Sequence, residues 1–318
     1  MTEGPGKYYV LLIIGTFTWG ASWVAAKILV EIAPPFTIGF FRFLIGSILF
    51  LSLLAALGTS PRALFTRERI KWLFLLGLTG IFGYGVCFLV GIRFTTAAQG
   101  SIIAGFNPVT ISLFAHIIHH ERLDRKWKYL GFGVSFLGVV FVVGVQALIE
   151  FKPEYLLGNL IILGAMCIWG LYSSIAKESM KTMTPLEANA GGAVIGTLLF
   201  GIGAIGEQAW TLPVYNNMVF WSCIIFLGAF TTFVGFLFFF IGIEKLGATR
   251  TGGFINFVPV FGTVLSVLIL AETIYWTFIV GLILVIAGVS LINFPARNSS
   301  GESSDSASRY DEMDGQKG

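Results

Sequence analysis

Long runs without charged residues recur along the chain. Outside residues 35–61 and 208–243, eight stretches between residues 8 and 296 contain no Asp, Glu, Lys or Arg over nineteen or more positions. A helix of about 20 apolar residues is needed to cross the hydrocarbon core of a membrane. Residues 35–57 form a similar run, in which Arg42 is the one charged residue. Residues 208–243 are uncharged and contain a loop at Pro213 followed by one further helix. The pattern predicts ten transmembrane helices, at residues 8–28, 35–57, 72–91, 95–117, 129–147, 157–177, 187–205, 218–241, 250–270 and 275–294.

Composition supports an all-α membrane protein. Hydrophobic residues make up 56% of the chain and charged residues 12%, about half the roughly 25% that soluble domains carry. A soluble enzyme, a disordered protein and a nucleic-acid binder are therefore disfavoured. The runs lack the period-two alternation of a membrane β-barrel, and helices satisfy their backbone groups internally.

The basic residues predict how the chain is oriented. If the N-terminus is cytoplasmic, sixteen of the twenty Lys and Arg lie on the inner side, three lie outside, and Arg42 lies within the membrane. Cytoplasmic loops carry such an excess of positive charge. We therefore expect a multi-pass protein of the cell membrane with both termini cytoplasmic. Residues 295–318, rich in Ser, Gly and acids, are expected to be a disordered cytoplasmic tail.

The two halves of the sequence repeat each other. A shift of 150 residues aligns Trp19-Gly20 with Trp169-Gly170, and a shift of 151 aligns Pro108 with Pro259. The repeat predicts one five-helix unit in residues 1–148 and a second in 149–294. Because five is odd, the second unit enters the membrane upside down. Inverted repeats are typical of secondary transporters, with the substrate near the midplane where the halves meet; a duplication that only builds a stable bundle is the alternative.

These features resemble the drug/metabolite transporter superfamily of the EamA type. The resemblance covers about residues 8–294 and rests on Trp19-Gly20, Trp169-Gly170, Arg42-Phe43, and the segments from Asn107-Pro108 to Glu121 and from Val258-Pro259 to Glu272. It implies a ten-helix carrier, and many such proteins export amino acids or other metabolites. The second half departs from the first at the arginine, because Gly192 occupies the position that corresponds to Arg42.

Arg42 is the most informative candidate for the transport site. It lies about eight residues into its helix, where a charged side chain is costly and should face protein or a water-filled cavity. A guanidinium suits a carboxylate or a phosphate, although a structural Arg bonded to helix-end carbonyls would look the same. No Asp or Glu lies deep in any span, so a buried acidic proton relay is not expected.

Further candidates occur at helical spacing around the expected centre. Amide side chains could supply hydrogen bonds to a substrate, and aromatic rings could supply apolar contact; ordinary core packing is the alternative for each. The candidate binding residues are Trp19, Arg42, Tyr84, Gln99, Asn107, Trp169, Tyr172, Phe238 and Asn256. Pro108 and Pro259 should kink their helices and act as hinges, because proline lacks a backbone donor.

Glu121 and Glu272 end corresponding helices at opposite membrane faces. They could close gates by pairing with basic residues or with helix N-termini, or they could be solvated helix ends. His116, His119 and His120 precede Glu121, and we interpret them as interfacial histidines without a metal.

The sequence thus predicts a secondary transporter, not an enzyme, that moves small organic solutes by alternating access. Amino acids or related metabolites are the leading class of solute, and the family resemblance implies export. A cation or cationic-drug transporter is the alternative, and a polytopic membrane enzyme is a weaker one. No cofactor, metal or nucleic acid is expected. The partners are a small-molecule solute and membrane lipid, and small-residue faces in 129–147 and 275–294 would also permit a homodimer.

Overall fold

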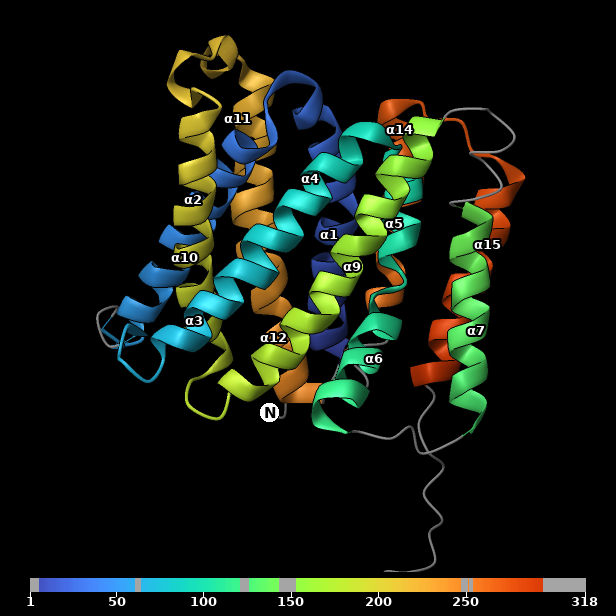
Figure 1. Ribbon diagram of the computed structural model, residues 1–318, viewed down its shortest axis with the longest axis horizontal. Helices are drawn as coiled ribbons and strands as arrows, with labels where there is room; N and C mark the ends of the chain where they lie inside the picture. The colour runs from blue at the N-terminus through green and yellow to red at the C-terminus, as the bar shows by residue number, and fades with distance from the viewer. Residues whose placement is uncertain are drawn as a thin grey trace, which may run out of the picture.

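The computed structural model describes residues 6–60, 64–120, 126–142, 153–246, 251 and 254–293. Regular structure within these residues is helical (Figure 1). The tail predicted at 295–318 lies outside the described residues.

Seven described helical stretches are long and apolar enough to cross a membrane, and three apolar helices are shorter. The seven are Gly6–Ile32, Pro35–Ala56, Ile70–Phe94, Ala97–His119, Glu154–Ser179, Pro185–Gly206 and Met218–Ile243. The shorter ones are Tyr129–Val140, Phe254–Leu270 and Trp276–Leu291. All coincide with predicted spans. The shorter helices border segments outside the described residues, so the full count of ten remains a prediction.

The first half contains helices α1 to α7 and a π-helical segment, η2. Their bounds are α1 (Gly6–Ile32), α2 (Pro35–Ala56), α3 (Ile70–Leu76), η2 (Gly77–Gly83), α4 (Tyr84–Phe94), α5 (Ala97–Ala104), α6 (Asn107–His119) and α7 (Lys126–Val140). Segments α3, η2 and α4 follow one another without a break and form a single span.

The second half repeats this order, including a π-helical segment, η6. Its elements are α9 (Pro153–Ser179), α10 (Pro185–Gly206), η4 (Ala209–Thr211), η5 (Pro213–Asn216), α11 (Met218–Ile225), η6 (Phe226–Val234), α12 (Gly235–Leu246), η7 (Phe254–Asn256), α14 (Phe257–Leu270) and α15 (Trp276–Asn293). Segment η6 occupies the register of η2, so the wide π-turn is itself part of the repeat.

Equivalent helices of the two halves pack against each other in opposite directions. Ser47 of α2 and Thr197 of α10, which are 150 residues apart, share a hydrogen bond of 3.1 Å between their hydroxyl oxygens. The start of α2 lies at the end of α10, because the amide of Phe36 donates to Glu207. A residue can contact its own repeat equivalent only close to a two-fold axis. The arrangement is the inverted one that five helices per repeat require.

Glycines allow the halves to approach at backbone distance. A Cβ atom added to Gly77 would lie 2.6 Å from Cβ of Ile195, and one added to Gly228 would lie 2.7 Å from Cβ of Ile45. Both glycines therefore lie on π-segments that cross a helix of the other half. Since Gly77 corresponds to Gly228 and Ile45 to Ile195, the same crossing is built twice.

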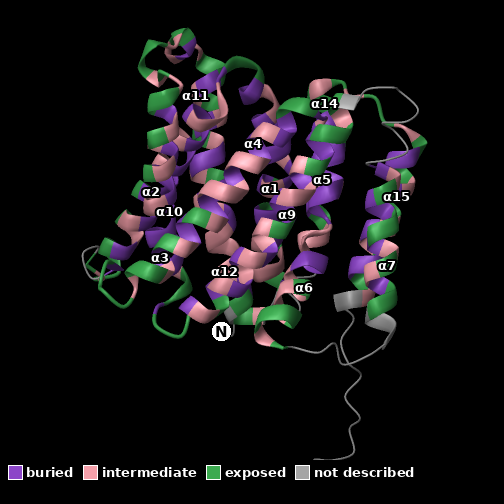
Figure 2. Cartoon of the chain, viewed as in Figure 1, coloured by how far each residue is buried: buried purple, intermediate pink, exposed green. Residues whose placement is uncertain are grey.

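The outer surface of the bundle is apolar where lipid would surround it. Large hydrophobic side chains on the outer faces of several helices are more than half exposed, among them Leu198, Ile202, Leu268 and Ile283. Buried positions gather along the inward sides of α1, α4 and α5 (Figure 2). Soluble proteins rarely expose so much contiguous apolar surface, and this surface fits a membrane-spanning protein.

The small-residue faces predicted for a homodimer are used within one chain. A Cβ atom on Gly138 of α7 would lie 2.8 Å from the carbonyl oxygen of Gly281 on α15, and Gly288 faces Gly131 in the same contact. Helices α7 and α15 are equivalents in the repeat and again run antiparallel. The glycine stripes thus serve packing within the chain, and a homodimer stays a prediction.

We expect Gly138→Ala to lower the free energy of unfolding by about 1 to 3 kcal/mol, as overpacked contacts do. The added methyl group meets backbone atoms of Gly281 and Val285, which cannot rotate away. Thermal unfolding in detergent measures the change. Gly133→Ala is the control on the same helix, because no atom lies within 4 Å of its added Cβ. Equal midpoints for the two variants would contradict the packing described here.

Candidate functional site

Aromatic rings from both halves meet at mid-height in the bundle. Trp169 of α9 contacts Tyr84 of α4 with ring centroids 4.9 Å apart, and it contacts Phe236 of α12 at 6.1 Å. Phe236 in turn contacts Trp19 of α1 at 5.4 Å. We call Trp19, Tyr84, Phe88, Trp169 and Phe236 the central cluster. Its rings touch one another, and they come from α1, α4, α9 and α12.

Arg42 of α2 lies beside this cluster and is 7% exposed. Its guanidinium carbon lies 4.9 Å from the ring centroid of Phe43 and 5.7 Å from that of Phe88, positions that allow cation–π attraction. No carboxylate pairs with Arg42 among the residues that the structure describes, so its charge is balanced there by rings and dipoles.

The hydrogen bonds of Arg42 leave most of its guanidinium unused. Nε donates to Oγ1 of Thr232 in η6, at 3.2 Å. Within the described part of the chain, the two terminal nitrogens have no hydrogen-bond partner, and they are not among the fully enclosed unpartnered atoms. They therefore reach space that a water-sized molecule can enter. A structural Arg42 is expected to bond helix-end carbonyls, and no such bond occurs among the described residues.

The remaining predicted aromatic residues divide into two groups. Tyr172 contacts Trp169 at 5.1 Å and donates a long hydrogen bond of 3.5 Å to Asn189, so it extends the central cluster toward α10. Phe238 lies instead against Gly15 of α1. The ring that joins the two tryptophans belongs to Phe236, two residues earlier.

The predicted hinges lie where helices are interrupted. Helix α5 ends at Ala104, and α6 begins at Asn107 with Pro108 in its first turn. In the second half the short turn η7 precedes α14, whose first turn contains Pro259. Pro108 has no amide hydrogen to bond the carbonyl of Ala104, which favours the break. Broken helices near the midplane are typical of transporter binding sites.

The predicted amide side chains are in different surroundings. Oδ1 of Asn107 is buried without a hydrogen-bond partner. Asn256 precedes α14 at the equivalent interruption, and its side chain makes no capping hydrogen bond there. Gln99 is 1% exposed, and its Oε1 accepts a hydrogen bond of 2.5 Å from Asn159 and one of 3.2 Å from Thr95. Gln99 thus belongs to a separate polar network near the start of α5, where it is already paired.

At the end of the bundle predicted to be outer, two glutamates bind helix N-termini of the other half. Glu272, which follows α14, accepts hydrogen bonds from the amides of Ala97 and Ala98 at 2.7 and 2.9 Å. Glu207, which follows α10, accepts from the amides of Phe36 and Thr37. A carboxylate at a helix N-terminus satisfies free amides and opposes the helix dipole.

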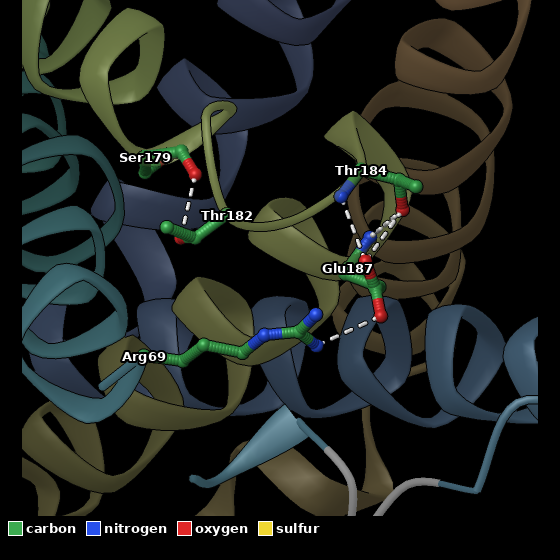
Figure 3. Close-up of polar contacts among 5 residues, drawn as sticks. All are labelled: Arg69, Ser179, Thr182, Thr184 and Glu187. Carbon is green, nitrogen blue, oxygen red and sulfur yellow. Dashed lines mark hydrogen bonds and ion pairs between the residues drawn. The ribbon is translucent and has the colours of Figure 1, made fainter. Parts of the chain in front are cut away.

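At the opposite end, the halves are joined by an ion pair and by a contact between a histidine and a carboxylate. Arg69, at the start of α3, donates to Glu187 of α10 at 3.0 Å (Figure 3). Glu187 also accepts from the amide and hydroxyl of Thr184 and so caps its own helix. His119 of α6 pairs with Glu178 of α9 at 3.2 Å. Glu121, the predicted counterpart of Glu272 in the first repeat, lies outside the described residues.

A cavity of about 700 Å³ lies away from these residues, on the side of the bundle. It is apolar and is formed by the outer ends of α2 and α10 with the turn that follows them. Its lining residues are Phe40, Phe41, Leu198, Gly201, Ile202, Ala204, Ile205, Ala209, Trp210 and Tyr215. At the centre the rings contact one another, and a central substrate cavity stays a prediction.

Sequence reasoning missed Thr232 and Phe236. A signal for Thr232 exists in the repeat, because the equivalent residue in the first half is Ile81. A hydroxyl replaces an alkyl group at Thr232, just as a guanidinium replaces hydrogen at Arg42 relative to Gly192. Phe236 carries no such signal, because phenylalanine is abundant in this part of the chain.

Comparison with known proteins agrees with the repeat. The EamA-like transporter family model matches residues 6–144 and again 156–294. The uncharacterized transporter YyaM of Bacillus subtilis is 29% identical over 302 residues, which cover 93% of this chain and 97% of that protein. An uncharacterized transporter of Archaeoglobus fulgidus is 26% identical over 294 residues, covering 90% and 98%.

A solved crystal structure of another protein has the same fold. Its TM-score is 0.65 at 21% sequence identity, and the match covers 93% of this chain and all of the other. Two matched repeats that together span most of the sequence establish the family: the chain belongs to the EamA-like transporter family.

Proposed function

We propose that this membrane transporter exports amino acids or closely related amphipathic carboxylates by alternating access. The observation that carries the proposal is the buried guanidinium of Arg42. Its terminal nitrogens are unpaired among the described residues, and it lies against the rings of Phe43 and Phe88 at the edge of the central cluster. Its free donors suit a carboxylate, and the central cluster suits an apolar body. The positive charge of Arg42 repels cations, and this argues against a cationic drug as the substrate.

The broken helix supplies a second contact of opposite character. Oδ1 of Asn107 is an enclosed acceptor without a partner, and such an atom costs about 1 to 3 kcal/mol of stability. An ammonium or hydroxyl group of a solute would satisfy it. A carboxylate for Arg42 and a donor group for Asn107 are the two polar groups of an amino acid, and this chemical match supports the amino-acid class.

The inverted arrangement of the two halves is suited to alternating access. The charged contacts at the two ends of the bundle join different helices, so one end can separate while the other stays closed. In the described conformation both ends are joined, at Glu272 and Glu207 on one side and at Arg69 and His119 on the other. We propose that this closed conformation encloses the solute and lies between the outward-open and inward-open forms of the transporter. Glu272 is then part of the outer gate, and Pro108 and Pro259 are the hinges.

Arg42→Gln is expected to reduce flux of carboxylated amino acids in proteoliposomes at least tenfold, because a hydrogen bond to a charged group is lost. Expression and thermal unfolding should change little, since Arg42 has one described hydrogen-bond partner. Arg67→Gln, at an exposed position, is the control. The solute is identified by measuring the flux of a panel of labelled amino acids and of cationic dyes, each with and without a proton gradient. Full flux in the Arg42 variant would refute the assigned role.

Asn107→Leu should separate stability from transport. Leucine has a similar shape and removes the unpartnered oxygen, so the midpoint of thermal unfolding is expected to stay the same or rise. Flux of amino acids should fall several-fold, while the matching deaminated acids should be less affected. Initial rates of both solute types measure this difference. A parallel loss for amino acids and deaminated acids would show that Asn107 does not contact the amine.

Glu272→Gln is expected to favour the outward-open form about threefold to tenfold, because an uncharged amide binds the helix N-terminus less well than a carboxylate. The rate of solute exchange and the accessibility of the site from outside should both rise. Glu31→Gln is the control, since that side chain is 65% exposed on the same side of the bundle. Wild-type exchange and wild-type thermal stability together would exclude a gating role.

A further inference from the structure

The contact between Arg42 and Thr232 lies at a helix crossing that the protein builds twice. Helix α2 crosses η6, and their repeat equivalents α10 and η2 cross in the same way. The added Cβ of Gly228 would lie 2.8 Å from the carbonyl oxygen of Arg42, and that of Gly77 would lie 2.9 Å from the carbonyl oxygen of Gly192. The two crossings therefore match at the level of the backbone.

The side chains at the two crossings differ in one respect. The crossing of α2 with η6 has Arg42 and Thr232, whereas the crossing of α10 with η2 has Gly192 and Ile81 at the equivalent positions. Thr232 packs on Gly46, with its Cγ2 atom 2.9 Å from the position of an added Cβ, and Ile81 packs on Gly196 in the same manner. The apolar crossing forms without any polar pair. Packing of the helices thus does not require the arginine or the hydroxyl.

The π-turn fixes the geometry of Thr232. Its hydroxyl donates to the carbonyl of Leu227, five residues earlier, at 2.9 Å. The hydroxyl hydrogen is thereby used, and the lone pairs of Oγ1 remain to accept from Nε of Arg42 at 3.2 Å. Thr232 is 2% exposed, so water does not compete for this bond. Holding the donor at Nε fixes the plane of the guanidinium, and the outer edge formed by its two terminal nitrogens keeps donors that no described residue uses.

We propose that Thr232 is the positioning residue of the transport site, which aims Arg42 at the carboxylate of the solute. The inference rests on the proposed function, since it assigns to Arg42 the role of carboxylate contact. It adds that the second half contributes to substrate selection through the π-turn rather than through a charge of its own. The site is consequently one-sided, although the scaffold around it is symmetric.

The test compares Thr232→Val, which keeps the shape and removes the acceptor, with Thr232→Ser, which keeps the hydroxyl. Binding of phenylalanine, leucine and benzoate to purified protein in detergent is measured by calorimetry, and phenylalaninol serves as the probe without a carboxylate. We expect Thr232→Val to weaken binding of the carboxylates about tenfold, as loss of a charged hydrogen bond does. Phenylalaninol should be unaffected, and Thr232→Ser should bind within about twofold of the wild type.

Ile81→Val is the matched control for packing, because it trims the equivalent residue of the apolar crossing. It should leave carboxylate binding unchanged, and thermal unfolding reports whether each variant is folded. Equal losses for Thr232→Val and Thr232→Ser, or an equal loss for phenylalaninol, would overturn the positioning role.

Arg42→Gln separates this inference from the proposed function. If it weakens carboxylate binding while Thr232→Val does not, Arg42 stands and Thr232 is rejected. If Arg42→Gln binds the carboxylates like the wild type, or if the wild type binds none of them, both proposals fail.

Discussion

The structure depends on the close antiparallel crossing of helices that are equivalent in the repeat. Lipid offers no hydrophobic force between helices, so close packing and internal hydrogen bonds must hold them together. Here glycines bring backbones into contact at α7 with α15 and where each π-segment crosses a helix of the other half. Glycines of α2 and α10 instead make room for phenylalanine rings of the opposite helix. Ser47 and Thr197 bond to each other across the two-fold axis. Because each contact is used twice, the two halves are held in the same way.

Symmetry of the scaffold makes the asymmetric residues conspicuous. Trp19 and Trp169 occupy equivalent positions, but Trp169 packs on Tyr84, whereas the indole of Trp19 approaches Gly235, the equivalent of Tyr84. The indole nitrogen of Trp19 donates to the carbonyl of Thr231 at 3.1 Å. Arg42 and Thr232 likewise have no polar counterpart. The scaffold is thus duplicated, and a few unmatched side chains make its centre asymmetric.

The charged residues differ between the centre of the bundle and its two ends. Glutamates lie at the ends of helices, where amides or basic side chains meet them, and Arg42 is the charged residue described within the middle of a span. Burying a charge in a membrane is costly unless protein groups compensate it. Two phenylalanine rings and one hydroxyl provide that compensation for Arg42 while leaving donors free, which is the arrangement expected of a group that receives an anion from outside.

The sequence by itself determined the helical class, the spans and the repeat, because a span needs only a long uncharged run and a repeat needs only matching residues in one register. It also indicated Arg42, Trp19 and Trp169, since a charge within a span and a tryptophan shared by both halves are visible in one dimension. Tertiary structure decided which rings meet: Phe236 rather than Phe238 joins the tryptophans, and Gln99 is paired with Asn159. It decided also that the glycine stripes pack within the chain. These outcomes depend on the rotation of each helix about its axis and on the π-turns, which contacts between distant segments set and local sequence does not.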